Sequence, residues 1–104
     1  MNNKEYNGWY NYETWVVSLW MDNEQGTYDY WRSVANDLVS LESPEFIADA
    51  NTRACRLADR IKDEHEQALP ELQGFPADLL NAAMSEVNWY EIAEHLLESV
   101  LEAS

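Results

Sequence analysis

Apolar side chains recur at intervals of three and four residues along most of this chain, and no segment alternates apolar and polar residues convincingly. The clearest case is the stretch 46–68, where most apolar residues fall within an arc of roughly 120° when plotted at about 100° per residue. Such a period is typical of amphipathic helices, whereas a period of two would indicate strands. We therefore predict an all-α fold, a compact bundle of four to five helices with an aromatic-rich amino-terminal arm.

Capping residues and prolines predict where these helices begin. Asn11 and Asn88 are good amino-terminal caps, and Glu91 would complete a capping-box-like pair with Asn88. Ser43-Pro44-Glu45 and Gly74-Phe75-Pro76 each place a proline at a helix start. The first ten residues are predicted to form an extended arm. The predicted helices cover about residues 12–21, 28–41, 43–69, 76–87 and 89–100. Residues 22–27 are either a turn or the capped start of the second helix.

The length and composition favour one folded domain over residues 1–104. Hydrophobic residues make up 46% of the chain and aromatic residues 12%, which is enough to build a core and unlike a disordered acidic tail. The amino terminus has no apolar signal core, and no apolar run approaches the ~18 residues of a membrane span. A single cysteine excludes an internal disulfide. We expect a cytoplasmic protein that does not engage membranes.

The net charge is −14, from 20 acidic and 6 basic residues. Binding a nucleic acid directly requires Lys and Arg to neutralise phosphates, so this charge argues against it. The charge also destabilises the compact state by self-repulsion, so a compensating benefit is expected. Solubility, a high-salt cytoplasm and electrostatic capture of a basic partner are the three candidate benefits.

Acidic residues are concentrated at the carboxyl end, where residues 63–104 contain ten acids and no Lys or Arg. Four glutamates of the last predicted helix fall within an arc of about 80°, opposite its apolar stripe. An ordinary solvated helix face is the alternative to a binding surface. If the acids do bind a partner, we expect the contact to involve Glu86, Glu91, Glu94, Glu98 and Glu102, with Asp63 and Glu66.

The basic residues between 53 and 62 have acidic neighbours four positions away, namely Asp49 with Arg53, Arg60 with Glu64 and Lys62 with Glu66. Such pairs support a helix surface by ~0.2–0.5 kcal/mol each. Cations folded across the last helix would neutralise its glutamates and remove the proposed binding face.

No pattern of residues indicates an active site, a cofactor or a metal centre. His65 lies within the apolar arc of its helix and is predicted to be a partly buried, hydrogen-bonded side chain. Cys55 is predicted to be a packed thiol. His95 lies beside Glu91 and Glu98, but a single helix supplies too few ligands for a convincing metal site. We expect a protein that is not an enzyme.

Aromatic residues crowd the amino-terminal third of the chain. Packing within the fold is the simplest interpretation of these rings. Tyr6, Trp9 and Tyr10 of the arm are also a candidate interface, including a contact between copies in a homo-oligomer, because Tyr and Trp are enriched in binding hot spots.

Two segments resemble a known group of proteins. Both are similar to segments of small uncharacterised proteins of phages, plasmids and other mobile elements. The first consists of Asn11-Tyr12-Glu13-Thr14-Trp15, followed by Leu19-Trp20, Asp22-Asn23-Glu24-Gln25-Gly26 and Tyr30-Trp31, and the second is the tail 87–96. This resemblance implies no catalytic residues. In charge and size the chain is also similar to the DNA-mimic inhibitors that act against restriction or CRISPR enzymes.

These observations together favour an acidic inhibitor that occupies the basic nucleic-acid groove of a host defence complex and blocks DNA binding. The alternative is a non-catalytic protein–protein interaction module, oligomeric through its aromatic residues, whose acidity serves solubility or a high-salt cytoplasm.

Overall fold

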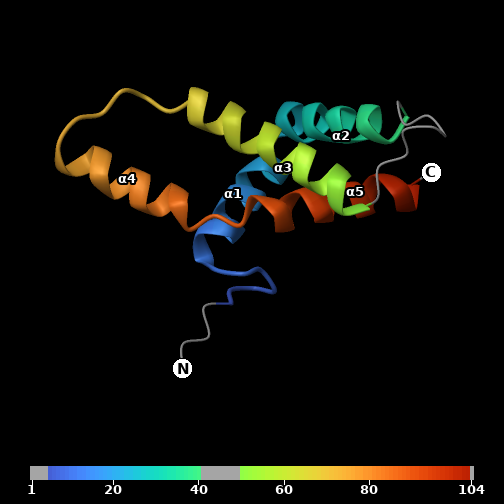
Figure 1. Ribbon diagram of the computed structural model, residues 1–104, viewed down its shortest axis with the longest axis horizontal. Coiled ribbons are helices and arrows are strands. Elements are labelled where there is room, and N and C mark those ends of the chain that lie inside the picture. Colours follow the sequence, from blue (N-terminus) through green and yellow to red (C-terminus); the bar gives the residue numbers. More distant parts are fainter. Residues whose placement is uncertain (1–4, 41–49, 104) are drawn as a thin grey trace.

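In the computed structural model, residues 5–40 and 50–103 are described, and these two stretches contain five α-helices and no strand (Figure 1). The helices are α1 (Tyr12–Asn23), α2 (Gln25–Ser40), α3 (Ala50–Gln67), α4 (Phe75–Ser85) and α5 (Trp89–Ala103). The predicted all-α bundle of four to five helices is confirmed.

The core is formed mainly by α2, α3 and α5. Helix α5 packs most extensively against α3, also packs against α2, and touches α1. Ala54 of α3 and Ala93 of α5 are 1% and 0% exposed, and such small side chains let two helix backbones approach closely. The predicted apolar stripe of the last helix is confirmed, because Trp89, Ile92, Ala93, Leu97 and Val100 are buried and Leu96 is half-buried.

The predicted caps hold two helix starts in place. Asn11 Oδ1 accepts the Thr14 backbone N–H at 2.9 Å at the start of α1, and Asn88 Oδ1 accepts the Glu91 backbone N–H at 3.0 Å at the start of α5. The second half of a capping box is absent at α5, since the Glu91 carboxylate accepts a hydrogen bond from the Tyr10 backbone N–H. Each side-chain cap satisfies a helix N–H that has no partner within its own helix.

Other predicted boundaries differ from the structure by a few residues. Helix α1 continues to Asn23, and only Glu24, in an extended conformation, separates it from α2. Residues 22–27 therefore include the start of the second helix and not a longer turn. Helix α3 ends at Gln67 and not near Leu69. Its predicted start at Ser43 lies outside the described residues.

The amino-terminal arm is folded and not extended over residues 6–9. The Tyr6 backbone N–H donates to the Trp9 carbonyl at 2.9 Å, and the Trp9 N–H donates to the Tyr6 carbonyl at 2.8 Å. Asn7 and Gly8 between them have φ angles of 50° and 88°. An Asn-Gly pair suits a tight turn because both residues tolerate the left-handed region. The Asn-Gly sequence was the signal for this turn, and the prediction of an extended arm overlooked it.

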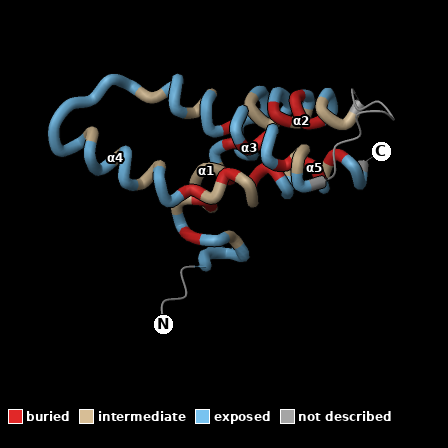
Figure 2. Tube along the Cα trace, in the orientation of Figure 1, coloured by how far each residue is buried: buried red, intermediate tan, exposed pale blue. Residues whose placement is uncertain are grey.

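Helix α4 stands apart from the other helices and extends away from the bundle (Figure 1). None of its residues is buried, and the tube in Figure 2 shows α4 in exposed and intermediate colours throughout. Met84, near its carboxyl end, packs against the core. Phe75 and Leu79, by contrast, are 75% and 60% exposed.

Candidate functional site

Three glutamates form an exposed row along α5. Glu94, Glu98 and Glu102 are all exposed, and their spacing of four residues separates successive positions by about 6 Å along the axis. The opposite side of the helix is in the core, so the backbone that carries the row is held in place. No ion pair to these three glutamates occurs among the described residues. This row, Glu94, Glu98 and Glu102, is called the acidic row below.

Glu91 differs from the acidic row, although it lies on the same helix. Its carboxylate Oε1 accepts the Tyr10 backbone N–H at 2.9 Å, and the residue is half-buried. Glu91 thus fastens the amino-terminal arm to α5. The sequence pattern could not reveal this role, because the two residues are far apart in the chain.

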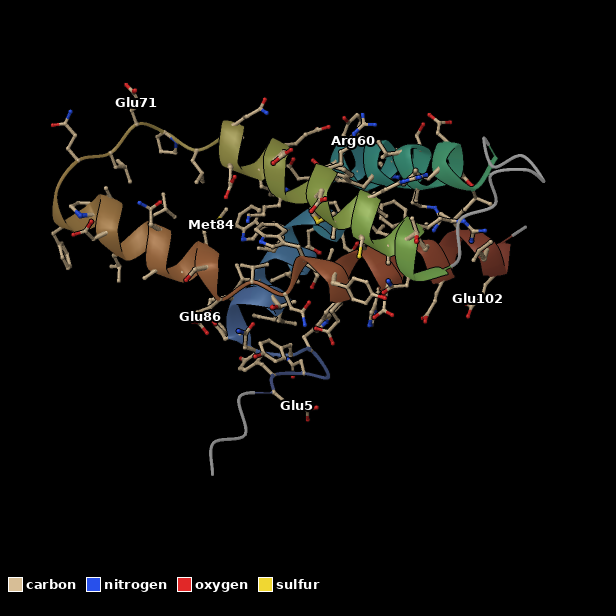
Figure 3. All side chains as sticks on the ribbon, viewed as in Figure 1. Glu5, Arg60, Glu71, Met84, Glu86 and Glu102 are labelled. Atoms are coloured by element: carbon tan, nitrogen blue, oxygen red, sulfur yellow. The ribbon has the colours of Figure 1, made fainter. Side chains whose placement is uncertain are left out.

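The structure divides the remaining predicted acids into separate groups. Glu86 lies at the junction of α4 and α5, and Figure 3 shows it far from Glu102, which lies near the carboxyl end of α5. Asp63 and Glu66 are exposed on α3, where Asp63 lines a hollow with Arg60 and Glu64. The seven acids therefore do not form one continuous patch.

Two arginines from other helices reach α5. Arg53 of α3 lines a shallow hollow together with Glu94, Glu98 and Leu101. The Nη1 atom of Arg32, on α2, donates a hydrogen bond to Ser99 Oγ. The acidic row thus has Arg53 at its border, although α5 itself carries no Lys or Arg.

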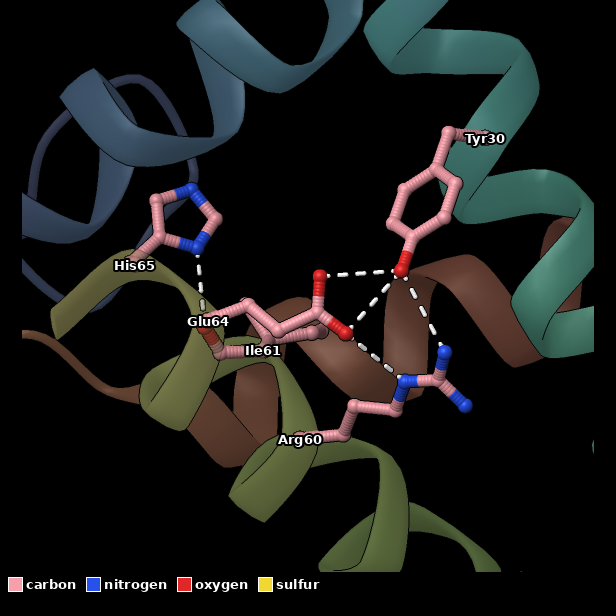
Figure 4. Close-up of polar contacts among 5 residues, drawn as sticks. All are labelled: Tyr30, Arg60, Ile61, Glu64 and His65. Atoms are coloured by element: carbon pink, nitrogen blue, oxygen red, sulfur yellow. Dashed lines mark hydrogen bonds and ion pairs between the residues drawn. The ribbon is translucent and has the colours of Figure 1, made fainter. Parts of the chain in front are cut away.

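Arg60, another cation of α3, is paired locally. Arg60 Nε donates to Glu64 Oε2 at 2.9 Å, and the Tyr30 hydroxyl from α2 bonds to both side chains (Figure 4). The predicted pair of Arg60 and Glu64 is confirmed. No ion pair joins Lys62 to Glu66 in the described structure, and Asp49 of the third predicted pair lies outside the described residues.

A buried polar network ties the start of α1 to the junction of α4 and α5. The Asn88 N–H donates to Thr14 Oγ1 at 2.8 Å, the Thr14 hydroxyl donates to Asn11 Oδ1 at 2.6 Å, and Asn11 Nδ2 donates to the Glu86 carbonyl at 2.6 Å. Asn11 and Thr14 are 3% and 0% exposed. Two residues of the segment Asn11–Trp15 therefore have a structural role.

The aromatic rings of the arm pack against the helices. The Tyr6 ring lies 5.0 Å from that of Tyr12 and 4.8 Å from that of Trp15, between ring centroids. The Trp9 ring lies 4.1 Å from the His95 imidazole. These contacts favour packing within the fold, although Tyr6 and Tyr10 remain 40% and 52% exposed.

The histidine and cysteine predictions have different outcomes. His65 is half-buried, its Nδ1 lies 2.8 Å from the Ile61 carbonyl oxygen, and its ring lies between those of Trp31 and Trp89, as predicted for a packed histidine. The prediction of a packed thiol at Cys55 is wrong, since this residue is exposed. Cys55 lies on the flank of α3, beside an open hollow that it lines with Tyr10 and Lys62.

Sequence reasoning missed Asp22, which the structure places near His95. Both side chains line a hollow between α1, α2 and α5, with Trp9 and Tyr28 among its other walls. Partial desolvation raises the pKa of the Asp22 carboxyl, and the charge of His95 opposes this effect. No local pattern predicts this pairing, because Asp22 and His95 belong to different helices.

Replacing Asp22 with Asn is expected to increase stability slightly at neutral pH. A carboxyl whose pKa is raised in the folded state disfavours folding once it is ionised, and this cost disappears as the pH falls below the ordinary pKa of 3.8. Chemical denaturation at pH 7 and pH 3 should show the gain for Asp22→Asn at pH 7 only.

Glu64→Gln is the comparison variant, and its effect on stability at neutral pH is expected to be opposite to that of Asp22→Asn. Hydrogen bonds from Arg60 and Tyr30 lower the pKa of the Glu64 carboxyl, so its contribution is present at neutral pH and is lost as the pH falls through that lowered pKa. This variant should be slightly less stable than the wild type at pH 7. Stability changes of the same sign and size in both variants would contradict the pKa directions given for Asp22 and Glu64.

The sequence matches a family described as a family of unknown function, DUF7249, over residues 2–102. The chain belongs to this family. Searches of curated proteins and of solved structures found no significant match.

Two further properties of this DUF7249 protein concern metals and membranes. In residues 5–40 and 50–103, no three or more His, Cys, Asp or Glu side chains gather in a way that could hold a metal ion, so Glu91, His95 and Glu98 do not form such a group. No helix in the same stretches has the length and apolar character needed to cross a bilayer.

Proposed function

We propose that this protein is a non-catalytic inhibitor whose acidic row binds the basic nucleic-acid groove of a partner protein, in the manner of a DNA mimic. The observation that carries the proposal is the exposure of Glu94, Glu98 and Glu102 on a helix whose other side is in the core. A row fixed in this way presents its charges to a partner without first having to order its backbone.

The overall charge supports the same proposal. A net charge of −14 attracts a basic surface over distances up to the Debye length, and such steering raises the association rate. Duplex DNA presents a charge about every 3.4 Å along each strand, so a row spaced at about 6 Å is sparser than a DNA strand.

The proposed partners are restriction or CRISPR complexes of a host cell, met in its cytoplasm. This choice follows the resemblance of the segments 11–31 and 87–96 to proteins of phages and plasmids. Complexes of this kind hold DNA through rows of Lys and Arg, and acids with a complementary arrangement would compete for them.

A second candidate function is a plain interaction module whose acidity serves solubility or a high-salt cytoplasm. The exposed apolar side chains of α4 favour this version, since they provide a contact that does not depend on charge. A protein adapted to high salt should unfold when the salt is removed, whereas an inhibitor of the proposed kind should remain folded and bind more tightly.

Reversing the acidic row is expected to abolish inhibition. The triple change Glu94→Lys, Glu98→Lys and Glu102→Lys replaces attraction by repulsion toward a basic groove, and we expect at least a ~100-fold loss of inhibitory potency. The measurement is DNA binding by purified restriction and CRISPR complexes in mobility-shift assays with increasing amounts of the protein. Wild-type inhibition should also weaken steeply between about 50 and 200 mM salt.

A matched control separates this surface from net charge. Glu24→Lys, Asp29→Lys and Asp37→Lys change the total charge by the same amount at exposed positions at the start of α2 and along it. This control should retain most of the inhibition, and circular dichroism should show both triple variants folded. Unchanged inhibition after reversal of the acidic row would refute the proposed surface.

A further inference from the structure

Helix α4 exposes a stripe of apolar residues that nothing in the described chain covers. Phe75, Leu79 and Ala82 lie at positions i, i+4 and i+7 and therefore share one face of the helix. All three are exposed, and Leu72, just before the helix, is 42% exposed. A contiguous apolar surface of this kind on a small protein usually marks an interaction site.

The length of α4 gives a second reason to expect a partner. The helix has 11 residues, and none of them is buried. Its amino-terminal cap residue is Gly74, which has no side chain to accept a hydrogen bond from the first turn. Isolated helices shorter than about 12–15 residues are marginal in water, because packing supplies most helix stability in proteins. Met84 contacts the core at one end of α4, so the outer face would gain most from a partner.

The charge distribution identifies the kind of partner. Asp78 is the sole charged residue between positions 72 and 85, in a chain whose net charge is −14. A basic protein would gain little electrostatic attraction at such a surface. Two copies of the chain, which repel each other over most of their surfaces, could approach here with Asp78 alone along the contact and Glu71 and Glu86 at its two ends.

We propose that α4 is a contact between two copies of this chain, in which the two helices pack antiparallel about a twofold axis near Leu79. This arrangement places the large Phe75 of each copy opposite the small Ala82 and Ala83 of the other, so that the facing surfaces are complementary in size. A pair of 11-residue helices is smaller than a standard stable interface. The dimer is therefore a weak one that forms as the concentration rises.

The contact does not involve the acidic row, and its salt dependence is opposite to that of partner binding. Added salt screens the repulsion between two acidic copies and strengthens hydrophobic association, so dimerisation should increase. Binding of the acidic row to a basic groove should decrease under the same conditions. The dimer can thus be tested without the proposed partner.

The test is the mass of the full chain by sedimentation equilibrium across a wide concentration range at low and high salt. We expect the 12.1 kDa monomer when dilute and twice that mass when concentrated, with association at least about tenfold stronger at high salt. Phe75→Glu with Leu79→Glu should remain monomeric throughout, because each copy would bring two more negative charges to the contact.

Two further variants guard against loss of the helix itself. Phe75→Ala with Leu79→Ala keeps strong helix formers in α4 and should also weaken association at least about tenfold. Trp20→Glu changes an aromatic residue that is 65% exposed on α1, outside the proposed contact, and should dimerise like the wild type.

A covalent trap tests the proposed geometry directly. In a Cys55→Ser background, Leu79→Cys should form an interchain disulfide readily, because the twofold axis brings the two positions together. A chain that stays monomeric at every concentration and salt, or a dimer that survives Phe75→Glu with Leu79→Glu, would overturn the proposal.

Discussion

Replacing Asn11 with Ala is expected to lower the free energy of unfolding by about 2–4 kcal/mol. The Asn11 side chain is 3% exposed and makes three hydrogen bonds, to the Thr14 N–H, the Thr14 hydroxyl and the Glu86 carbonyl. Loss of an amino-terminal cap costs ~1 kcal/mol, and each buried group left without a partner adds ~1–3 kcal/mol. The measurement is urea denaturation followed by circular dichroism.

Thr14→Val and Asn81→Ala refine this test. Thr14→Val keeps the shape of the side chain but removes the acceptor of the Asn88 N–H, so it should cost about 1–3 kcal/mol. Asn81 is exposed on α4, and its replacement by Ala should be neutral or slightly stabilising, because Ala is the better helix former. Equal small effects at Asn11 and Asn81 would show that the buried network contributes little.

Replacing Leu57 with Ala is expected to cost about 2–5 kcal/mol. Leu57 is 0% exposed on α3, the helix that packs most extensively against α5. Removing its side chain loses the transfer free energy of the deleted carbons and leaves a cavity that a close-packed interior fills only in part. Thermal and urea denaturation should both record the loss.

Leu101→Ala is the matched control for Leu57→Ala. Leu101 is 46% exposed near the end of α5, so the same deletion there should cost less than about 1 kcal/mol. A similar loss at both positions would mean that the packing of α3 on α5 does not dominate the stability of the bundle.

Several elements of the fold could be predicted because their causes are local. Asn11 and Asn88 cap the nearest helix through side chains that reach only three residues ahead. Pro76 fits the first turn of α4 because it lacks an N–H, and the N–H groups of a first turn have no partner within the helix. The apolar stripe of α5 was likewise visible in the sequence, since residues three and four apart share a helix face.

The predicted acidic surface was less complete, because it depends on how the helices meet. Spacing along α5 correctly placed Glu94, Glu98 and Glu102 on one exposed side. It could not show that Glu91 accepts a hydrogen bond from the arm, or that Arg53 lines a hollow beside Glu94 and Glu98. Both facts concern residues that are distant in sequence, and helix periodicity carries no information about such contacts.

The sequence by itself determined the helical class of this protein, the caps of α1 and α5 and the exposed side of α5, since each follows from interactions within a few residues. Only the tertiary structure decided that Asn11 and Thr14 join α1 to the α4–α5 junction, that Asp22 and His95 line one hollow, and that Phe75 and Leu79 remain uncovered. The physical reason is that burial and hydrogen bonding between helices depend on which faces pack together, and packing is a property of the whole chain.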